Sequence, residues 1–167
     1  MAGSSSRPTH TMMRALRASI DALVIGAASI AALVALRMHE GRLAERSAVE
    51  STQAALSTMR AELGIRSALG DGPLNEFGFP DSIDRGWFTG EEPHNALARS
   101  HAPWIETALP AEYDRTHPAD PTFRGGRGAM FWYNPVRGVV RARVPLQTSD
   151  ASSRSLYEVV NGEPWEP

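Results

Sequence analysis

The stretch "GAMFWYNPVRGVVRARVP", Gly128 to Pro145, carries the pattern of a β-hairpin. In the segment Asn134–Gly138, asparagine, proline and glycine stand at positions suited to a type I turn with a following left-handed residue. The return strand "VVRARV" alternates, so that Val140, Ala142 and Val144 share one face and basic residues share the other. We therefore predict two antiparallel strands whose apolar face packs on the rest of a domain.

The opposite face of the hairpin is a candidate binding surface. It carries Arg141 and Arg143, and Arg137 lies in the turn near Trp132. Arginines beside aromatic rings can stack on nucleic-acid bases, but aromatic residues in strands more often pack across strands, and the net charge of −2 provides no general attraction to nucleic acid. We expect no nucleic-acid partner. The three arginines are candidate partner-binding residues that form ion pairs with neighbouring subunits or with Glu158.

Composition limits the chemistry that this chain can carry out. Its 167 residues suffice for one domain and an extension, and the absence of cysteine excludes disulfides, thiolate metal sites and cysteine nucleophiles. His94, His101 and His117 lack the spacing of a recognised metal site, and no nucleophile elbow is present. We expect no metal, no cofactor and no enzymatic activity.

Further elements are expected on either side of the hairpin. The segment "SLYEVV", residues 155–160, alternates like a third strand, so an antiparallel sheet of three or four strands is predicted to lie on a helix. Short helices are predicted around residues 95–99 and 103–109. The segment from Gly70 to Asn95 is rich in glycine, proline and aspartate, which favours loops.

The N-terminal part carries a long apolar run. In "ASIDALVIGAASIAALVAL", Ala18 to Leu36, only Asp21 is charged, and these residues would extend roughly 28 Å as a helix. This length predicts a transmembrane helix, with a core helix or a cleaved signal peptide as the alternatives. The sequence after the run, "RMHEGRLAER", lacks a small-residue cleavage site and favours an uncleaved anchor. The arginines are equal in number on both sides, and we expect the short N-terminal tail to stay in the cytoplasm while the long C-terminal part is exported.

The helical pattern continues beyond this run. Leucine, valine and methionine recur at helical spacings up to Leu63, and Gly64 is predicted to end the helix. The expected organisation is a basic leader at 1–17, the transmembrane helix at 18–36, an amphipathic helix at 37–63 and an exported α+β domain at 64–167.

This layout resembles that of type IV pilin-like proteins, particularly the pseudopilins of type II secretion systems. Those proteins begin with a short basic leader, an apolar helix with an acidic residue near its start, and a helical continuation that packs on a small antiparallel sheet. In "RASIDALVIGAASIAALVAL", Asp21 occupies the place of the acidic residue. The resemblance implies that Asp21 takes part in subunit assembly.

The function that this resemblance implies is structural. It implies a pseudopilin-like subunit of a secretion or pilus-type assembly, single-pass in the inner membrane with its C-terminal domain outside the cytoplasm. Its partners would be membrane lipid, other pilin-like subunits and inner-membrane assembly components, in a homo- or hetero-oligomer. The alternatives are a single-span coiled-coil envelope adaptor and a membrane-anchored enzyme or ligand-binding domain.

Overall fold

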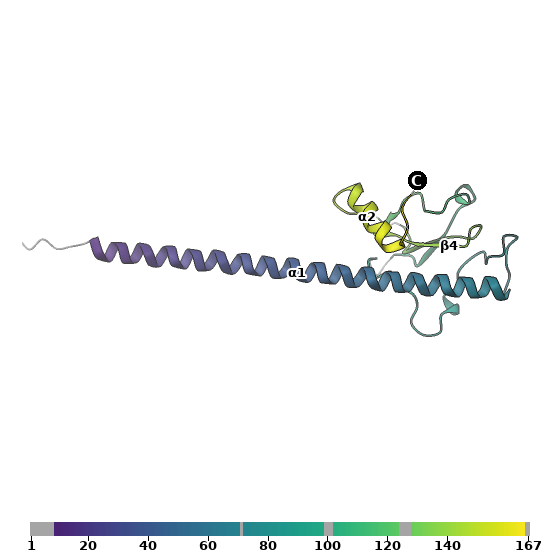
Figure 1. Ribbon diagram of the computed structural model, residues 1–167, viewed down its shortest axis with the longest axis horizontal. Helices are drawn as coiled ribbons and strands as arrows, with labels where there is room; N and C mark the ends of the chain where they lie inside the picture. The colour runs from purple at the N-terminus through teal and green to yellow at the C-terminus, as the bar shows by residue number, and fades with distance from the viewer. Residues whose placement is uncertain (1–8, 71, 99–101, 124–127, 166–167) are drawn as a thin grey trace, which may run out of the picture. The chain divides into compact units, whose positions relative to one another are not determined.

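The computed structural model describes the backbone of residues 9–70, 72–98, 102–123 and 128–165, and the side chains within these ranges from residue 32 onward. The chain forms two compact units, Met1–Ala44 and Glu45–Pro167. The elements, shown in Figure 1, are α1 (Thr9–Leu69), η1 (Arg85–Trp87), β1 (Ile105–Thr107), η2 (Pro110–Glu112), β2 (Thr122–Phe123), β3 (Phe131–Asn134), β4 (Val139–Ala142), β5 (Val144–Pro145) and α2 (Asp150–Asn161).

Helix α1 continues past its predicted end. It runs through Gly64 and stops at Leu69, where Gly70 has a φ of 65° and supplies the left-handed residue that commonly follows a helix. A glycine inside a helix costs about 1 kcal/mol relative to alanine. The burial of Leu63 and the ion pair between Arg66 and Glu62, with an N–O distance of 2.8 Å, favour continuation.

No helix among the residues that the structure describes combines the length and apolar character needed to cross a bilayer. This finding overturns the predicted fold class with respect to the transmembrane helix over residues 18–36. The side chains of residues 18–31 lie outside the described part of the chain, and those of residues 32–36 are exposed.

The predicted hairpin is confirmed. Strands β3 and β4 pair antiparallel, with Phe131 opposite Ala142 and Asn134 opposite Val139, and Gly138 in the turn has a φ of 62°. The predicted antiparallel sheet is nevertheless wrong, because β1 joins the other side of β3 in parallel and makes the sheet mixed, in the order β1-β3-β4. A parallel neighbour needs a long connection, and here it is supplied by the chain between β1 and β3, which includes η2 and β2.

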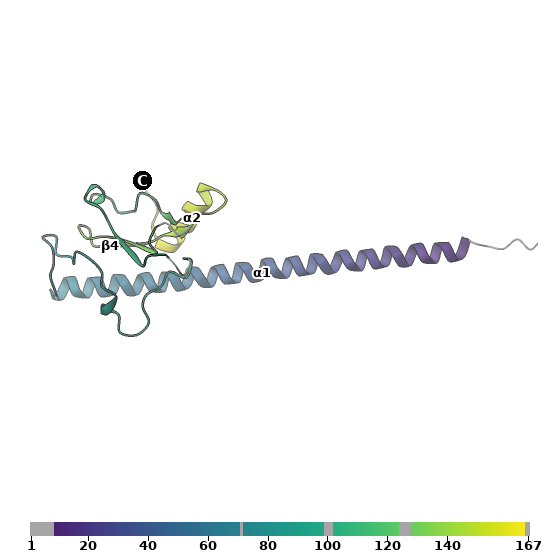
Figure 2. The ribbon, with the colours of Figure 1, turned by 180° about the vertical axis from the view of Figure 1, so that it is seen from behind.

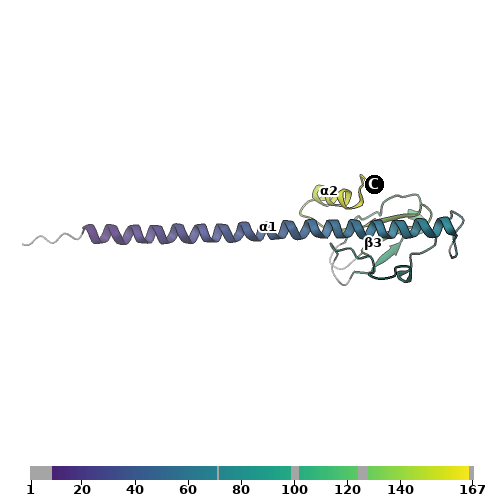
Figure 3. The same cartoon turned by 60° about the horizontal axis from the view of Figure 1, so that its bottom comes forward.

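The core lies between one face of the hairpin and the C-terminal part of α1. Figures 1 and 2 show α2 and β4 on one side of this part of the helix, and Figure 3 shows β3 beside it. The fully or almost fully buried side chains at this contact are Leu56, Met59 and Leu63 from α1 and Phe131, Tyr133, Val140 and Ala142 from the sheet. Burial of this apolar area is the main stabilising contribution to the domain.

The other face of the hairpin is covered as well. The side-chain amide of Asn134 donates to the backbone carbonyls of Glu112, Tyr113 and Arg115, at 2.8 to 3.2 Å. Trp132, also on this face, is fully buried. The chain around η2 therefore packs where the sequence pattern predicts an exposed basic face.

The last element is a helix rather than the predicted third strand. Ser149 caps α2 by accepting a hydrogen bond from the backbone N–H of Ser152, and Gly162, with a φ of 72°, follows its end. The buried residues of α2 are Ser153, Tyr157, Val160 and Asn161, which is helical spacing. The predicted helix over residues 103–109 is also wrong, because this segment contains β1.

Helix α2 closes the free edge of β4. The side chain of Asn161 accepts from the Ala142 N–H at 2.9 Å and donates to the Ala142 carbonyl at 3.0 Å. It therefore occupies the hydrogen-bonding groups that a further strand would use. Exposed sheet edges promote unwanted pairing, and here a side-chain amide blocks the edge.

Candidate functional site

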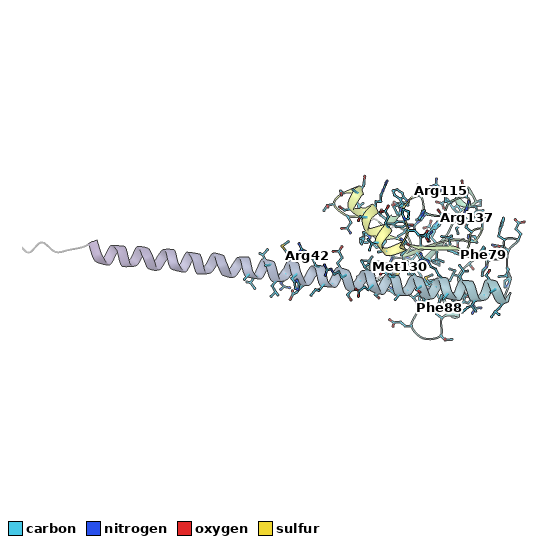
Figure 4. The ribbon with its side chains drawn as sticks, in the orientation of Figure 1. Arg42, Phe79, Phe88, Arg115, Met130 and Arg137 are labelled. Atoms are coloured by element: carbon cyan, nitrogen blue, oxygen red, sulfur yellow. The ribbon has the colours of Figure 1, made fainter. Side chains whose placement is uncertain are left out.

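The structure separates the three candidate arginines. Arg137 is exposed in the hairpin turn and is labelled in Figure 4. Arg141 and Arg143, by contrast, are only 4% and 7% exposed. Asp21 lies outside the residues whose side chains are described.

Arg141 holds the C-terminal segment against the sheet. Its guanidinium binds both carboxylate oxygens of Glu163, and its Nε donates to the carbonyl oxygen of Thr116 at 3.1 Å. Two parallel hydrogen bonds to one carboxylate fix both groups in orientation as well as in distance. Glu158, the expected partner of these arginines, instead accepts from the backbone N–H of Trp165 at 3.1 Å.

Arg143 connects two other parts of the domain. It forms an ion pair with Glu106 in β1 and donates from Nε to the carbonyl oxygen of Asp120 at 3.1 Å. Arg141 and Arg143 are thus both engaged inside the domain, and only Arg137 presents its charge to solvent. The side chains of Glu163 and Glu106 are about half exposed, whereas both arginines are buried. Removing either glutamate would therefore leave a buried guanidinium without its carboxylate, which is destabilising.

Next to these ion pairs lie two buried polar rings. A hydrogen bond of 3.1 Å joins Nδ1 of His117 to the hydroxyl of Tyr157, and both side chains are buried. Burial raises the pKa of Tyr157, because its charged form would lose hydration, while Arg141 acts in the opposite direction. The tyrosine is therefore neutral at ordinary pH and serves as a packed, hydrogen-bonded side chain.

The surface of the domain has shallow hollows. One of about 520 Å³ lies between α1 and the end of α2 around Arg60, and another of about 450 Å³ is lined by Asp120, Asp150 and Arg154. Arg154 stacks on Trp165, with its guanidinium carbon 4.8 Å from the ring centre. Within the described ranges, no three His, Asp or Glu side chains gather closely enough to hold a metal ion.

Large apolar side chains are exposed on α1 within the first unit. We call this the apolar surface, and it consists of Leu33, Val34, Leu36, Met38 and Leu43, which are 50 to 62% exposed. The sequence pattern places Leu36 and Leu43 in one amphipathic series with Leu56, Met59 and Leu63. Of these residues, only Leu56, Met59 and Leu63 are buried in the core of the structure. Leu33, Leu36 and Leu43 lie on one side of the helix, and Val34 and Met38 lie on the other. Exposed apolar side chains gathered in this number mark an interaction surface.

No protein-family model, curated protein or solved structure matches this chain.

Proposed function

We propose that this protein is a non-enzymatic, pilin-like assembly subunit that associates with other subunits through α1. The proposal is supported by a difference in burial between two parts of this helix. Its residues Leu56, Met59 and Leu63 are buried against the sheet, whereas the residues of the apolar surface are half exposed or more. One helix thus anchors a small α+β domain and also presents apolar side chains for contact with other helices.

The free energy of the expected helix contact can be estimated from the exposed fractions of these side chains. Complete burial of a large aliphatic side chain contributes about 1.5 to 3 kcal/mol, and roughly half of each side chain is available on the apolar surface. Each residue would then contribute about 1 kcal/mol. Five such residues on each of two chains would contribute roughly 10 kcal/mol, which is comparable with the cost of association of about 4 to 15 kcal/mol. Neither a membrane-spanning helix nor an inner-membrane location is part of this proposal.

The buried arginines also favour a structural role over catalysis. Arg141 and Arg143 are paired with Glu163 and Glu106, so their charges stabilise the domain. The three hollows around Arg60, Arg154 and Leu156 contain no histidine in their linings that could activate a serine or threonine there as a nucleophile.

The proposal is tested with a triple variant of the full chain, Leu33→Ser, Leu36→Ser and Leu43→Ser. Sedimentation velocity over a concentration series should show assembly of the wild-type chain and a monomer for the triple variant. The matched control is Leu69→Ser with Leu109→Ser, because these leucines are 76% and 64% exposed outside the apolar surface. Unchanged assembly of the triple variant, or a wild-type chain that stays monomeric, would contradict the proposal.

A further inference from the structure

A row of polar and small residues follows α1 beside its buried row. We call it the polar stripe, and its members are Arg46, Glu50, Gln53, Ser57, Arg60 and Gly64. The spacings of four and three residues place them on one face of the helix. Arg60 is half buried and the other members are exposed. Gln53 donates from Nε2 to the carbonyl oxygen of Val159 at 2.8 Å, so a partner that binds the stripe also meets the end of α2.

Arg60 is the most unusual member of the stripe. Its Nη2 donates to the carbonyl oxygens of Val140 and Asn161, at 3.3 Å each, and no described carboxylate forms an ion pair with it. Burial lowers the pKa of this guanidinium, and repulsion from Arg141 adds to the effect. The nearby carboxylate of Glu163 is bound to Arg141. Glu163 attracts the charge of Arg60 without forming an ion pair with it, so no described carboxylate of the domain fully compensates this charge.

The complementary charge lies on the same stripe. Glu50 is exposed and forms no ion pair with any residue that the structure describes, and the same holds for Arg46. At about 1.5 Å per residue, Glu50 lies roughly 15 Å along the helix from Arg60. One face of one helix thus carries one acid, Glu50, and two bases, Arg46 and Arg60, that form no ion pair among the described residues.

We propose that the polar stripe binds the polar stripe of a second copy of this chain, with the two helices antiparallel about a two-fold axis near residue 55. In this register Glu50 of each copy meets Arg60 of the other. Gln53 meets Ser57, and Arg46 meets Gly64. Every pair joins opposite charges or a long side chain with a short one.

Gly64 provides the space that this register needs. It lies inside α1, and a Cβ built on it would meet no heavy atom within 4 Å. A long arginine side chain of the second copy can therefore lie across the helix at this point. Around Arg60, the hollow of about 520 Å³ between α1 and the end of α2 receives the incoming glutamate.

The charges of Glu50 and Arg60 favour an antiparallel orientation of the two α1 helices. In a parallel pair with the same register, Glu50 would meet Glu50 and Arg60 would meet Arg60, which is repulsive at both places. An antiparallel contact converts both into attraction and closes at two copies, because the same surface is used on each side. This inference goes beyond the proposed function and uses other residues of α1.

Charge reversal in the full chain tests the pairing. Arg60→Glu and Glu50→Arg should each weaken the dimer by about tenfold or more, because each turns two attractive pairs into two repulsive ones. The double variant should recover most of the affinity. Glu45→Arg is the matched control, since it makes the same charge change on an exposed residue outside the stripe. Dissociation constants come from sedimentation equilibrium, and circular dichroism checks folding.

Two further experiments keep the test independent of folding. Gly64→Leu should favour the helix, because leucine is the better helix former, yet it should weaken the dimer by filling the space for Arg46. Because the chain has no cysteine, a mixture of Gln53→Cys and Ser57→Cys chains reports orientation through disulfide formation. An antiparallel dimer should give mainly the disulfide between a Gln53→Cys chain and a Ser57→Cys chain.

The outcomes separate this dimer from assembly through the apolar surface. If the apolar-surface variant loses assembly while both charge reversals leave affinity unchanged, the dimer is wrong and the proposed function stands. If the charge reversals weaken association and the double variant restores it, the dimer is supported. Preferential crosslinking of Gln53→Cys with itself, or a wild-type chain that stays monomeric, would overturn the dimer.

Discussion

Substitution of Asn161 tests how α2 holds the domain together. Asn161→Ala removes three hydrogen bonds, two to the Ala142 peptide and one of 2.9 Å from the side-chain amide to the Tyr157 carbonyl. Asn161 and Ala142 are 2% and 0% exposed, so the N–H and carbonyl of Ala142 lose their partners in a buried place. A buried unsatisfied group costs about 1 to 3 kcal/mol. The two groups of Ala142 together would cost about 2 to 6 kcal/mol. Because Asn161 borders a hollow that water can enter, we expect a loss in the lower half of this range, at about 3 kcal/mol.

The assay is urea unfolding of the full chain followed by tryptophan fluorescence. With a slope of about 1.5 kcal/mol per molar urea, a loss of about 3 kcal/mol lowers the midpoint by about 2 M. Asn161→Asp keeps the size of the side chain but places a carboxylate beside two carbonyl oxygens, and should also lower the midpoint. Val159→Ala, at a residue that is 54% exposed on the same helix, should change the free energy of unfolding by less than about 0.5 kcal/mol.

A small change in the urea midpoint of Asn161→Ala would contradict a stabilising role of its side chain at the sheet edge. If Asn161→Ala lowered the midpoint by less than about 0.5 M at an unchanged slope, corresponding to less than about 1 kcal/mol, the two hydrogen bonds to the strand would contribute little. Loss of the edge block should also increase strand-mediated aggregation of the variant, measured by light scattering.

Three further predictions concern the core, the ionisable groups and the turn. The fragment 45–167 should fold by circular dichroism and unfold cooperatively, whereas 70–167, which lacks the helical part of the core, should not. Burial raises the pKa values of Tyr133 and Tyr157, so the folded state keeps their protons while the unfolded state loses them above pH about 10. The free energy of unfolding should therefore fall as the pH rises above that value. In a Tyr113→Phe chain, which retains only these two tyrosines, tyrosinate absorbance at 295 nm should increase only with unfolding. Gly138→Ala should lower the melting temperature, because the new Cβ would lie 2.2 Å from a phenyl ring carbon and the φ of 62° disfavours alanine; an unchanged melting temperature would contradict this.

The hairpin is predicted correctly from the sequence, but its surroundings are not. Alternating residues and the turn sequence predict β3, β4 and the left-handed Gly138, and all three are present. These features depend on neighbouring residues and on backbone sterics, so a local pattern suffices. The alternation of Val140 with Arg141 correctly separates two faces. It does not reveal that both are covered, since the cover comes from the chain around η2.

The error in the C-terminal segment has a local explanation. "SLYEVV" fits a strand by alternation, but Ser149 and Gly162 are recognisable helix ends, and the buried Ser153, Tyr157 and Val160 have helical spacing. The signal for α2 was therefore present in the sequence. The parallel pairing of β1 had no such signal, because the three residues of this strand acquire their partner only from β3.

The sequence by itself determined the long helix, the hairpin and the absence of cysteine chemistry, because these depend on composition and on the spacing of near neighbours. Only the tertiary structure decided which leucines of α1 enter the core and which stay exposed. It also decided that Arg141 and Arg143 are buried in ion pairs while Arg60 is left without one. The physical reason is that burial and charge compensation depend on residues that lie far apart in the chain and meet only in the folded domain.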